Sequence, residues 1–313
     1  MNLQWYYFPF QNREGWFNIQ GPKMIISSRK SFWESVALIA SSTESGGVVS
    51  AYNGYDQCVV TLGILQFAGS VAGSPLMRLI TKFYELDKDL VMKHLQPALD
   101  KVPGSELVYN GKCLFKIDGI EVIKFAEWCN LIQEGVSGVK GTWTESAKET
   151  SKVWAECFIR LAEEPKFIEV QKKFFVDQLK STYFANANIQ VTDKDTGKKV
   201  IVRPLDVFSY DESTIETELN YKRALIATYI SYGANIPALA SQKLYDSVVK
   251  YPDRSWTEKF KYFALNCKSS TVKEWSIRWA KISGILVQEF GVDIDLNLDP
   301  STSYLDEIVI TPE

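Results

Sequence analysis

The feature that most constrains the fold is a helical spacing of apolar residues that fills most of the chain after position 120. Segments 120–134, 145–163 and 166–186 place apolar side chains every three or four residues, which is the spacing of one face of an α-helix. Each such helix must bury its apolar stripe against a neighbour, so a mainly helical core is predicted. Further helices are expected at 28–42, 75–86, 87–100, 211–232, 236–249, 255–267 and 271–290.

Three short segments interrupt the helices and carry the marks of β-hairpins. They are 48–67, turning at Asn53–Gly54; 105–118, turning at Asn110–Gly111; and 189–203, turning at Asp195–Gly197. Asn and Gly adopt the left-handed conformations that tight hairpin turns need. The predicted fold class is therefore α+β, mainly α, with a helical body and small β-ribbons.

The two ends of the chain differ from this body. Residues 1–27 are rich in aromatic side chains and are broken by Gly- and Pro-containing turns, a pattern typical of short strands or an extended arm. Residues 291–313 are acidic and include an Asp-Pro-Ser-Thr-Ser linker. We therefore expect an N-terminal arm over 1–27, a folded domain over 28–290 and an extended tail over 291–313.

Charge and hydropathy exclude several kinds of partner. The chain has 313 residues, of which 35 are Lys or Arg and 38 are Asp or Glu, and this balance gives no electrostatic basis for nucleic-acid binding. No run of 18 apolar residues is present, so no membrane span is expected. The N-terminus lacks the basic and apolar regions of a signal peptide. We expect synthesis in the cytoplasm and action on the cell wall or periplasm only after delivery by other means.

Cysteine and histidine usage narrows the chemistry. The five cysteines are scattered and none forms a C-x-x-C pair, so neither a disulfide framework nor a zinc knuckle is expected. His94 is the single histidine, and any Ser-His-Asp triad, Cys-His dyad or histidine-based metal site would depend on it. No metal and no cofactor are therefore expected. Any hydrolysis by this chain is expected to use carboxylates.

Two carboxylates lie in unlike predicted surroundings within residues 44–67. Glu44 ends a mainly apolar helix, where partial desolvation raises the pKa of a carboxyl group and keeps a proton near neutral pH. Asp56 lies on a more polar hairpin, where it would stay ionised. Two such groups facing each other across a groove can hydrolyse a glycosidic bond. Glu44 is the candidate acid and Asp56 the candidate base.

Four neighbouring residues are candidates for supporting roles. The Thr61 hydroxyl could hold a water near Asp56, and Gly63 permits a sugar to approach the backbone. Gln66 offers both a donor and an acceptor to a sugar substituent, and Tyr52 could stack on a sugar ring. Each also has a structural alternative in a compact domain, as a ribbon residue, a turn residue, a hydrogen bonder at the edge of the core or a core aromatic.

At these residues the chain resembles the lysozyme superfamily. A helix-ending Glu, a hairpin Asp and the segment Thr61–Ile64 follow the order of phage-type lysozymes. The spacing from Asp56 to Thr61 and the following glycine is similar to that of the chitosanase branch. Segments 154–183, which contains Gln171, and 223–233 resemble two further helical segments of that branch.

The resemblance covers residues 28–290 and implies a lysozyme-like helical core with small hairpins beside an active-site cleft. It implies that Glu44 and Asp56 act as acid and base and that Thr61 positions the water. Gly63 and Gln66 carry over as groove lining.

The implied function is that of a muramidase-type peptidoglycan hydrolase, associated with a bacteriophage or a contractile injection system. The Glu44–Gly47 segment also resembles lytic transglycosylases, in which one glutamate does the chemistry. The distance in sequence from Glu44 to Asp56 is longer than in phage-type lysozymes and shorter than in chitosanases, so chitosan stays open as a substrate. A third alternative is a catalytically inactive, lysozyme-like structural component of a virion or injection apparatus, attached through segment 1–27 or 291–313.

Overall fold

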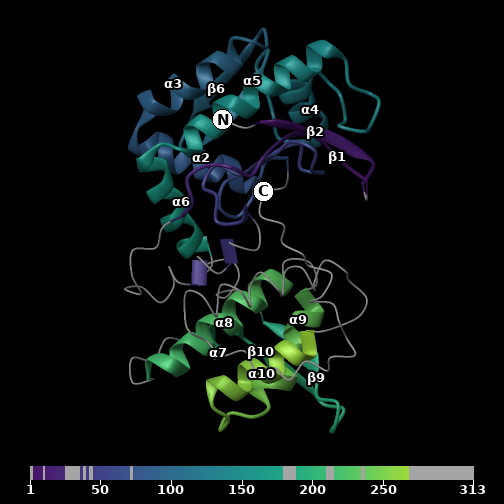
Figure 1. Ribbon diagram of the computed structural model, residues 1–313, viewed down its shortest axis with the longest axis vertical. Coiled ribbons are helices and arrows are strands. Elements are labelled where there is room, and N and C mark those ends of the chain that lie inside the picture. Colours follow the sequence, from purple (N-terminus) through teal and green to yellow (C-terminus); the bar gives the residue numbers. More distant parts are fainter. Residues whose placement is uncertain are drawn as a thin grey trace. The chain divides into compact units, whose positions relative to one another are not determined.

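The chain folds into two units, which are described separately. The computed structural model describes residues 3–9, 11–24, 36–37, 40–41, 45–70, 73–178, 188–208, 215–233 and 237–267. The first unit comprises Met1–Ile25 and Glu44–Phe174, and the second comprises Ile26–Thr43 and Phe175–Glu313 (Figure 1). The expected arm over 1–27, domain over 28–290 and tail over 291–313 stay a prediction.

A five-stranded antiparallel sheet in the order β1-β2-β3-β4-β5 lies in the first unit. Its strands are β1 (Gln4–Phe8), β2 (Arg13–Asn18), β3 (Tyr52–Asn53), β4 (Thr61–Leu62) and β5 (Phe67–Ala68). β1 pairs with β2 along its whole length, and β2 continues the sheet by placing Phe17 opposite Asn53. The aromatic N-terminal segment is therefore part of the same sheet as the hairpin that carries the candidate site.

Helices and a second sheet complete the first unit. They are α2 (Pro75–Leu86), α3 (Lys88–Leu99), β6 (Ser105–Tyr109), β7 (Cys113–Ile117), β8 (Ile120–Glu121), α4 (Phe125–Gln133), α5 (Glu145–Ala162) and α6 (Pro165–Gln178), which belongs to this unit as far as Phe174. The core holds large aromatic side chains: Phe115 makes edge contacts with Trp128 and Trp154, at centroid distances of 5.9 and 5.4 Å.

The helix boundaries follow local capping. Ser74 accepts a hydrogen bond from the Met77 backbone N–H and precedes Pro75, which favours a helix start. The predicted helix at 120–134 begins later than expected, because Ile120–Glu121 pairs with β7 as strand β8. The Glu127 carboxylate then accepts the backbone N–H groups of Ile123 and Lys124, which fixes the start of α4 at Phe125.

The described residues of the second unit form a β-ribbon and a group of helices. They are β9 (Ile189–Thr192), β10 (Lys199–Val202), α7 (Pro204–Val207), α8 (Glu216–Gly233), α9 (Pro237–Leu244), the π-helical turn η2 (Tyr245–Val249) and α10 (Trp256–Cys267). Glu218 on α8 accepts the Trp256 backbone N–H and the Thr257 hydroxyl, which ties the start of α10 to α8.

The predicted fold class is confirmed at the level of an α+β protein that is mainly helical, with three small antiparallel sheets among the described residues. The helices expected at 75–86, 87–100 and 145–163 agree with α2, α3 and α5. The helix expected at 271–290 and the tail at 291–313 lie outside the described residues. Among the helices that the structure describes, none is both long and apolar enough to cross a lipid bilayer.

Candidate functional site

Ser45 fixes the chain at the position that follows the candidate acid. Glu44 itself lies outside the described residues. Ser45 is 1% exposed, and its hydroxyl donates a hydrogen bond of 2.9 Å to the carbonyl of Ile64. Ile64 lies in the turn between β4 and β5, so the residue after Glu44 is attached to the turn that contains Gly63 and Gln66.

Thr61 and Gln66 are brought together by this turn. Thr61 is buried at the start of β4, and its Oγ1 donates to Gln66 Oε1 at 2.8 Å. Gln66 Nε2 donates in turn to the carbonyls of Ala51 and Gly63, at 3.2 Å each. Gln66 has φ of 52°, a conformation that is uncommon for a residue other than glycine. The Thr61 proton is engaged with Gln66, while its oxygen retains the capacity to accept a hydrogen bond.

Gly63 makes room for a side chain of the protein itself. Its φ is 85°, and a Cβ atom at this position would lie 2.2 Å from Gln171 Oε1. Gln171 on α6 is fully buried, accepts the Ile64 backbone N–H and donates to the carbonyls of Val49 and Ala162. The Gln171 side chain therefore occupies the space beside Gly63 that was expected to admit a sugar. The sequence analysis identified Gln171 only as part of a segment that resembles the chitosanase branch.

Tyr52 lies in the core. It is 1% exposed, and its ring stacks on Phe158 with centroids 6.4 Å apart. Burial also raises the pKa of Tyr52 above its usual value. The ring next to Asp56 in sequence is Tyr55, which is half-buried; burial raises the pKa of Tyr55 to about 12, and the neighbouring Tyr6 and Asp56 act in the same direction.

Asp56 lies in the loop between β3 and β4. It is half-buried, and its Oδ1 accepts the backbone N–H of Gln57 at 2.6 Å. Its backbone carbonyl accepts a hydrogen bond of 3.2 Å from Arg13 Nη2, and the carbonyl of Tyr55 accepts one of 2.8 Å from Arg13 Nε. Among the described residues, no hydrogen bond joins the side chains of Asp56 and Thr61. Arg13 was not a predicted site residue, since nothing in its local sequence indicates a contact with this loop.

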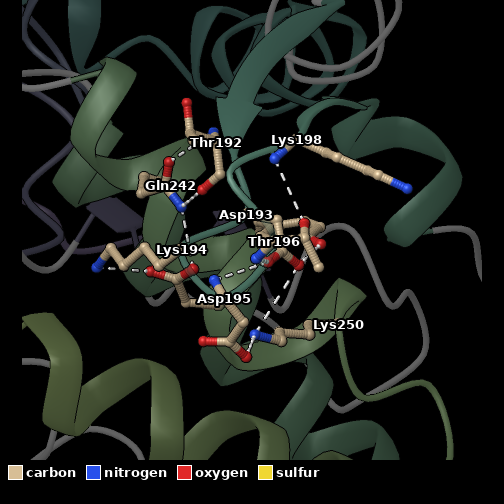
Figure 2. A network of polar contacts seen from close by, with 10 residues as sticks. Thr192, Asp193, Lys194, Asp195, Thr196, Lys198, Gln242 and Lys250 are labelled. Atoms are coloured by element: carbon tan, nitrogen blue, oxygen red, sulfur yellow. Dashed lines mark hydrogen bonds and ion pairs between the residues drawn. The ribbon is translucent and has the colours of Figure 1, made fainter.

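Two further clusters of titratable side chains in the described residues are paired internally. His94 pairs with Glu164 through Nε2, 2.6 Å from a carboxylate oxygen. In the second unit, the turn after β9 holds a polar network (Figure 2) in which Asp193 accepts the Tyr245 hydroxyl and the Thr196 backbone N–H. These bonds, the Tyr245 hydroxyl first, hold the pKa of Asp193 well below its usual range. Within the described ranges, no group of three or more His, Cys, Asp or Glu side chains is arranged to hold a metal ion.

Comparison with known proteins adds no assignment. No protein-family model matches the chain, and neither a curated protein nor a solved structure matches it. The geometry around the β4–β5 turn and the loop at Asp56 is therefore the basis for a functional proposal.

Proposed function

We propose that this chain cleaves β-1,4-glycosidic bonds of peptidoglycan, with Glu44 as the general acid and Asp56 as the general base. The observation that carries the proposal is the hydrogen bond from Ser45 to Ile64. It attaches the residue after Glu44 to the small antiparallel sheet whose β3–β4 loop carries Asp56. Ser45 is helical and the strands β3 to β5 follow it in the chain, which is the order that the lysozyme resemblance implies.

The proposed reaction needs a proton donor and a proton acceptor on opposite sides of the bond. Glu44 gives its proton to the glycosidic oxygen as the bond to the anomeric carbon breaks. Asp56 takes a proton from the water that attacks the same carbon from the other face, so the product is inverted. Inversion requires the two carboxyl groups to lie about 6.5–9.5 Å apart. The free acceptor capacity of the Thr61 oxygen suits it to hold that water.

A second candidate is the lytic transglycosylase reaction, in which Glu44 acts alone. The specific observation in its favour is the hydrogen bond from the Gln57 backbone N–H to Asp56 Oδ1. This contact gives the Asp56 carboxylate a role in shaping its own loop. In that reaction the sugar's own hydroxyl attacks the anomeric carbon and the product ends in an anhydro sugar.

The test is digestion of purified peptidoglycan by the wild type, Glu44→Gln and Asp56→Asn, with release of reducing ends and product masses as readouts. General acid and base groups each contribute about 10²- to 10⁴-fold, so both variants should lose at least about 100-fold. Glu145→Gln is the matched control, because the Glu145 side chain is 91% exposed and pairs with Lys148 on the same helix, and it should retain full activity.

The outcomes separate the candidates. Wild-type activity in Glu44→Gln would refute the assignment of the acid. Retained activity in Asp56→Asn together with anhydro ends would establish the transglycosylase reaction. Failure of the wild type on both peptidoglycan and chitosan would refute catalysis and favour a structural module of a virion or injection apparatus.

A further inference from the structure

Arg13 is a buried cation that binds main-chain oxygens. Its side chain is on β2, and the residue is 8% exposed. Nε and Nη2 donate to the carbonyls of two consecutive residues, Tyr55 and Asp56, at 2.8 and 3.2 Å. Among the described residues, no carboxylate forms an ion pair with it. Burying a charge costs free energy unless its hydrogen bonds are made. We therefore expect the folded protein to keep the bonds from Arg13 to the two carbonyls.

The surroundings of Arg13 are shaped for its guanidinium. The group lies over the ring of Phe125, 5.7 Å from the centroid. Gly138, with φ of 80°, passes so close that a Cβ atom there would lie 2.7 Å from Nη2. The backbone N–H of Glu14 donates to the carbonyl of Gly138, and Arg13 forms a β-bridge with Val139. The side chain is therefore held from several directions.

Three acidic groups interact with the Arg13 guanidinium, and Asp56 is the one carboxylate among those three. Burial lowers the pKa of Arg13, while Cys129, Asp56 and Cys58 act in the opposite direction. Burial raises the pKa of each of the two thiols to about 11, so both are neutral at pH 7. An arginine stays protonated in proteins, and the interaction of its charge with Asp56 favours that protonated form.

We infer that Arg13 is a positioning residue for Asp56: its two N–H groups hold the main chain of residues 55–56 in one conformation. The N-terminal hairpin β1–β2 then contributes a residue to the candidate site. The role of Arg13 in hydrolysis rests on the proposed function, because it assumes that Asp56 is the base. The contact with the two carbonyls does not depend on that assumption.

The test compares Arg13→Gln and Arg13→Lys with the wild type in two measurements. The first is the ¹³C chemical shift of the carbonyl carbons of Tyr55 and Asp56, with Val49 as an internal reference that Arg13 does not contact. The second is the separation of kcat from KM on peptidoglycan. Lysine keeps the charge but lacks the planar fork of donors.

Both carbonyl shifts should move in Arg13→Gln, and kcat should fall about 10- to 100-fold with KM nearly unchanged, since misplacement of a reacting group by about 1 Å can cost 10²-fold. Arg13→Lys should recover only part of kcat. Should Arg13→Gln not fold, Gly138→Ala replaces it, because the added methyl group displaces Nη2 while Arg13 is retained.

The results that overturn the inference differ from those that overturn the proposed function. Unchanged carbonyl shifts in a folded Arg13→Gln variant, or a kcat equal to that of the wild type, would refute the positioning role even if Glu44→Gln is inactive. An inactive wild type whose carbonyl shifts respond to Arg13→Gln would refute the hydrolase and leave the contact established.

Discussion

The β4–β5 turn of the first unit and the β9–β10 turn of the second are fixed by different kinds of bond. In the first, neutral side chains reach buried backbone groups: Gln171 holds Ile64, and Ser45 holds its carbonyl. In the second, carboxylates close the turn: the buried Asp193 accepts the Tyr245 hydroxyl, and Asp195 is paired to Lys250 at the surface (Figure 2). A buried backbone group without a hydrogen-bond partner costs free energy of folding. Exposed ion pairs contribute little to stability and are screened by salt.

The difference in bonding agrees with the part of the molecule to which each turn belongs. The first turn contains Gly63 and Gln66 and follows Thr61 on β4, all of which the sequence singled out as site residues. Its hydrogen bonds involve no group that titrates near neutral pH. Its geometry should therefore be independent of pH and salt. The second turn closes a two-stranded ribbon, and its stability should depend on pH and salt. Four predictions test the contrast, from the largest expected effect to the smallest.

Gln171→Ala should have the largest effect. The substitution leaves the Ile64 N–H and two carbonyls without partners in the core and opens a cavity. Each unsatisfied buried group costs about 1–3 kcal/mol, so the free energy of unfolding should fall by about 3 kcal/mol or more in urea denaturation. Gln96→Ala is the control, since the Gln96 side chain makes an exposed hydrogen bond to Asp100, and it should change stability by less than about 0.5 kcal/mol. Equal losses would contradict the assigned role of Gln171.

Gly63→Ala should be the next most destabilising. A left-handed backbone costs an alanine about 1–2 kcal/mol, and the new Cβ would also collide with Gln171 Oε1. Gly73→Ala is matched, because Gly73 has φ of 70° and nothing within 4 Å of the added Cβ. The loss in thermal or urea unfolding should be larger at position 63. If the two variants unfold alike, the contact between Gly63 and Gln171 does not constrain the turn.

Asp193→Asn should lower stability only where the wild-type carboxylate is ionised. The pKa of Asp193 is held below its usual range by the Tyr245 hydroxyl, and an unfolded aspartate has a pKa of about 3.9. Its contribution is therefore present above the unfolded value and is lost as the pH falls toward the folded one. The difference in Tm between wild type and variant should be full at pH 6 and shrink toward pH 2. A difference that stays constant would show that the ionised form is not what stabilises this turn.

Lys250→Met should produce the smallest effect, and one that depends on salt. The ammonium group pairs with Asp195, whose side chain is largely exposed. At 1 M ionic strength the Debye length is about 3 Å, so a small drop in Tm at low salt should disappear. Lys112→Met serves as the control, because Lys112 is exposed and forms no ion pair among the described residues. A salt-independent drop would indicate packing of the lysine stem.

Local sequence signals predicted the parts of the fold that local contacts determine. Ser74 and Pro75 mark the start of α2 because the capping bond joins residues three positions apart. Thr61 was expected near Asp56, whereas the hydrogen bond that its hydroxyl makes to Gln66 was not anticipated. The hydrogen bond from the Ile64 backbone N–H to Gln171 spans 107 positions, and the local spacing of apolar residues cannot predict a contact between residues so far apart in the sequence.

The candidate site was predictable only in part for the same reason. The contact of Arg13 with Tyr55 spans 42 positions, and Arg13 lies in a segment whose composition suggested an arm. A tyrosine in a predicted hairpin can face either a sugar or the core, and the sequence does not distinguish the two. The register of Tyr52 in β3 places its ring against Phe158. Glu44 lies outside the described residues, so its role stays a prediction.

The pairing of β2 with β3 has a practical consequence for shortened forms of the chain. A version beginning at residue 28 would lack both strands of the hairpin and leave the backbone groups of Tyr52 and Asn53 without their partners Asn18 and Phe17. An uncovered strand of this kind is a template for pairing with another molecule. Such a truncated protein is expected to self-associate, and its loss of solubility would follow from the missing neighbour strand.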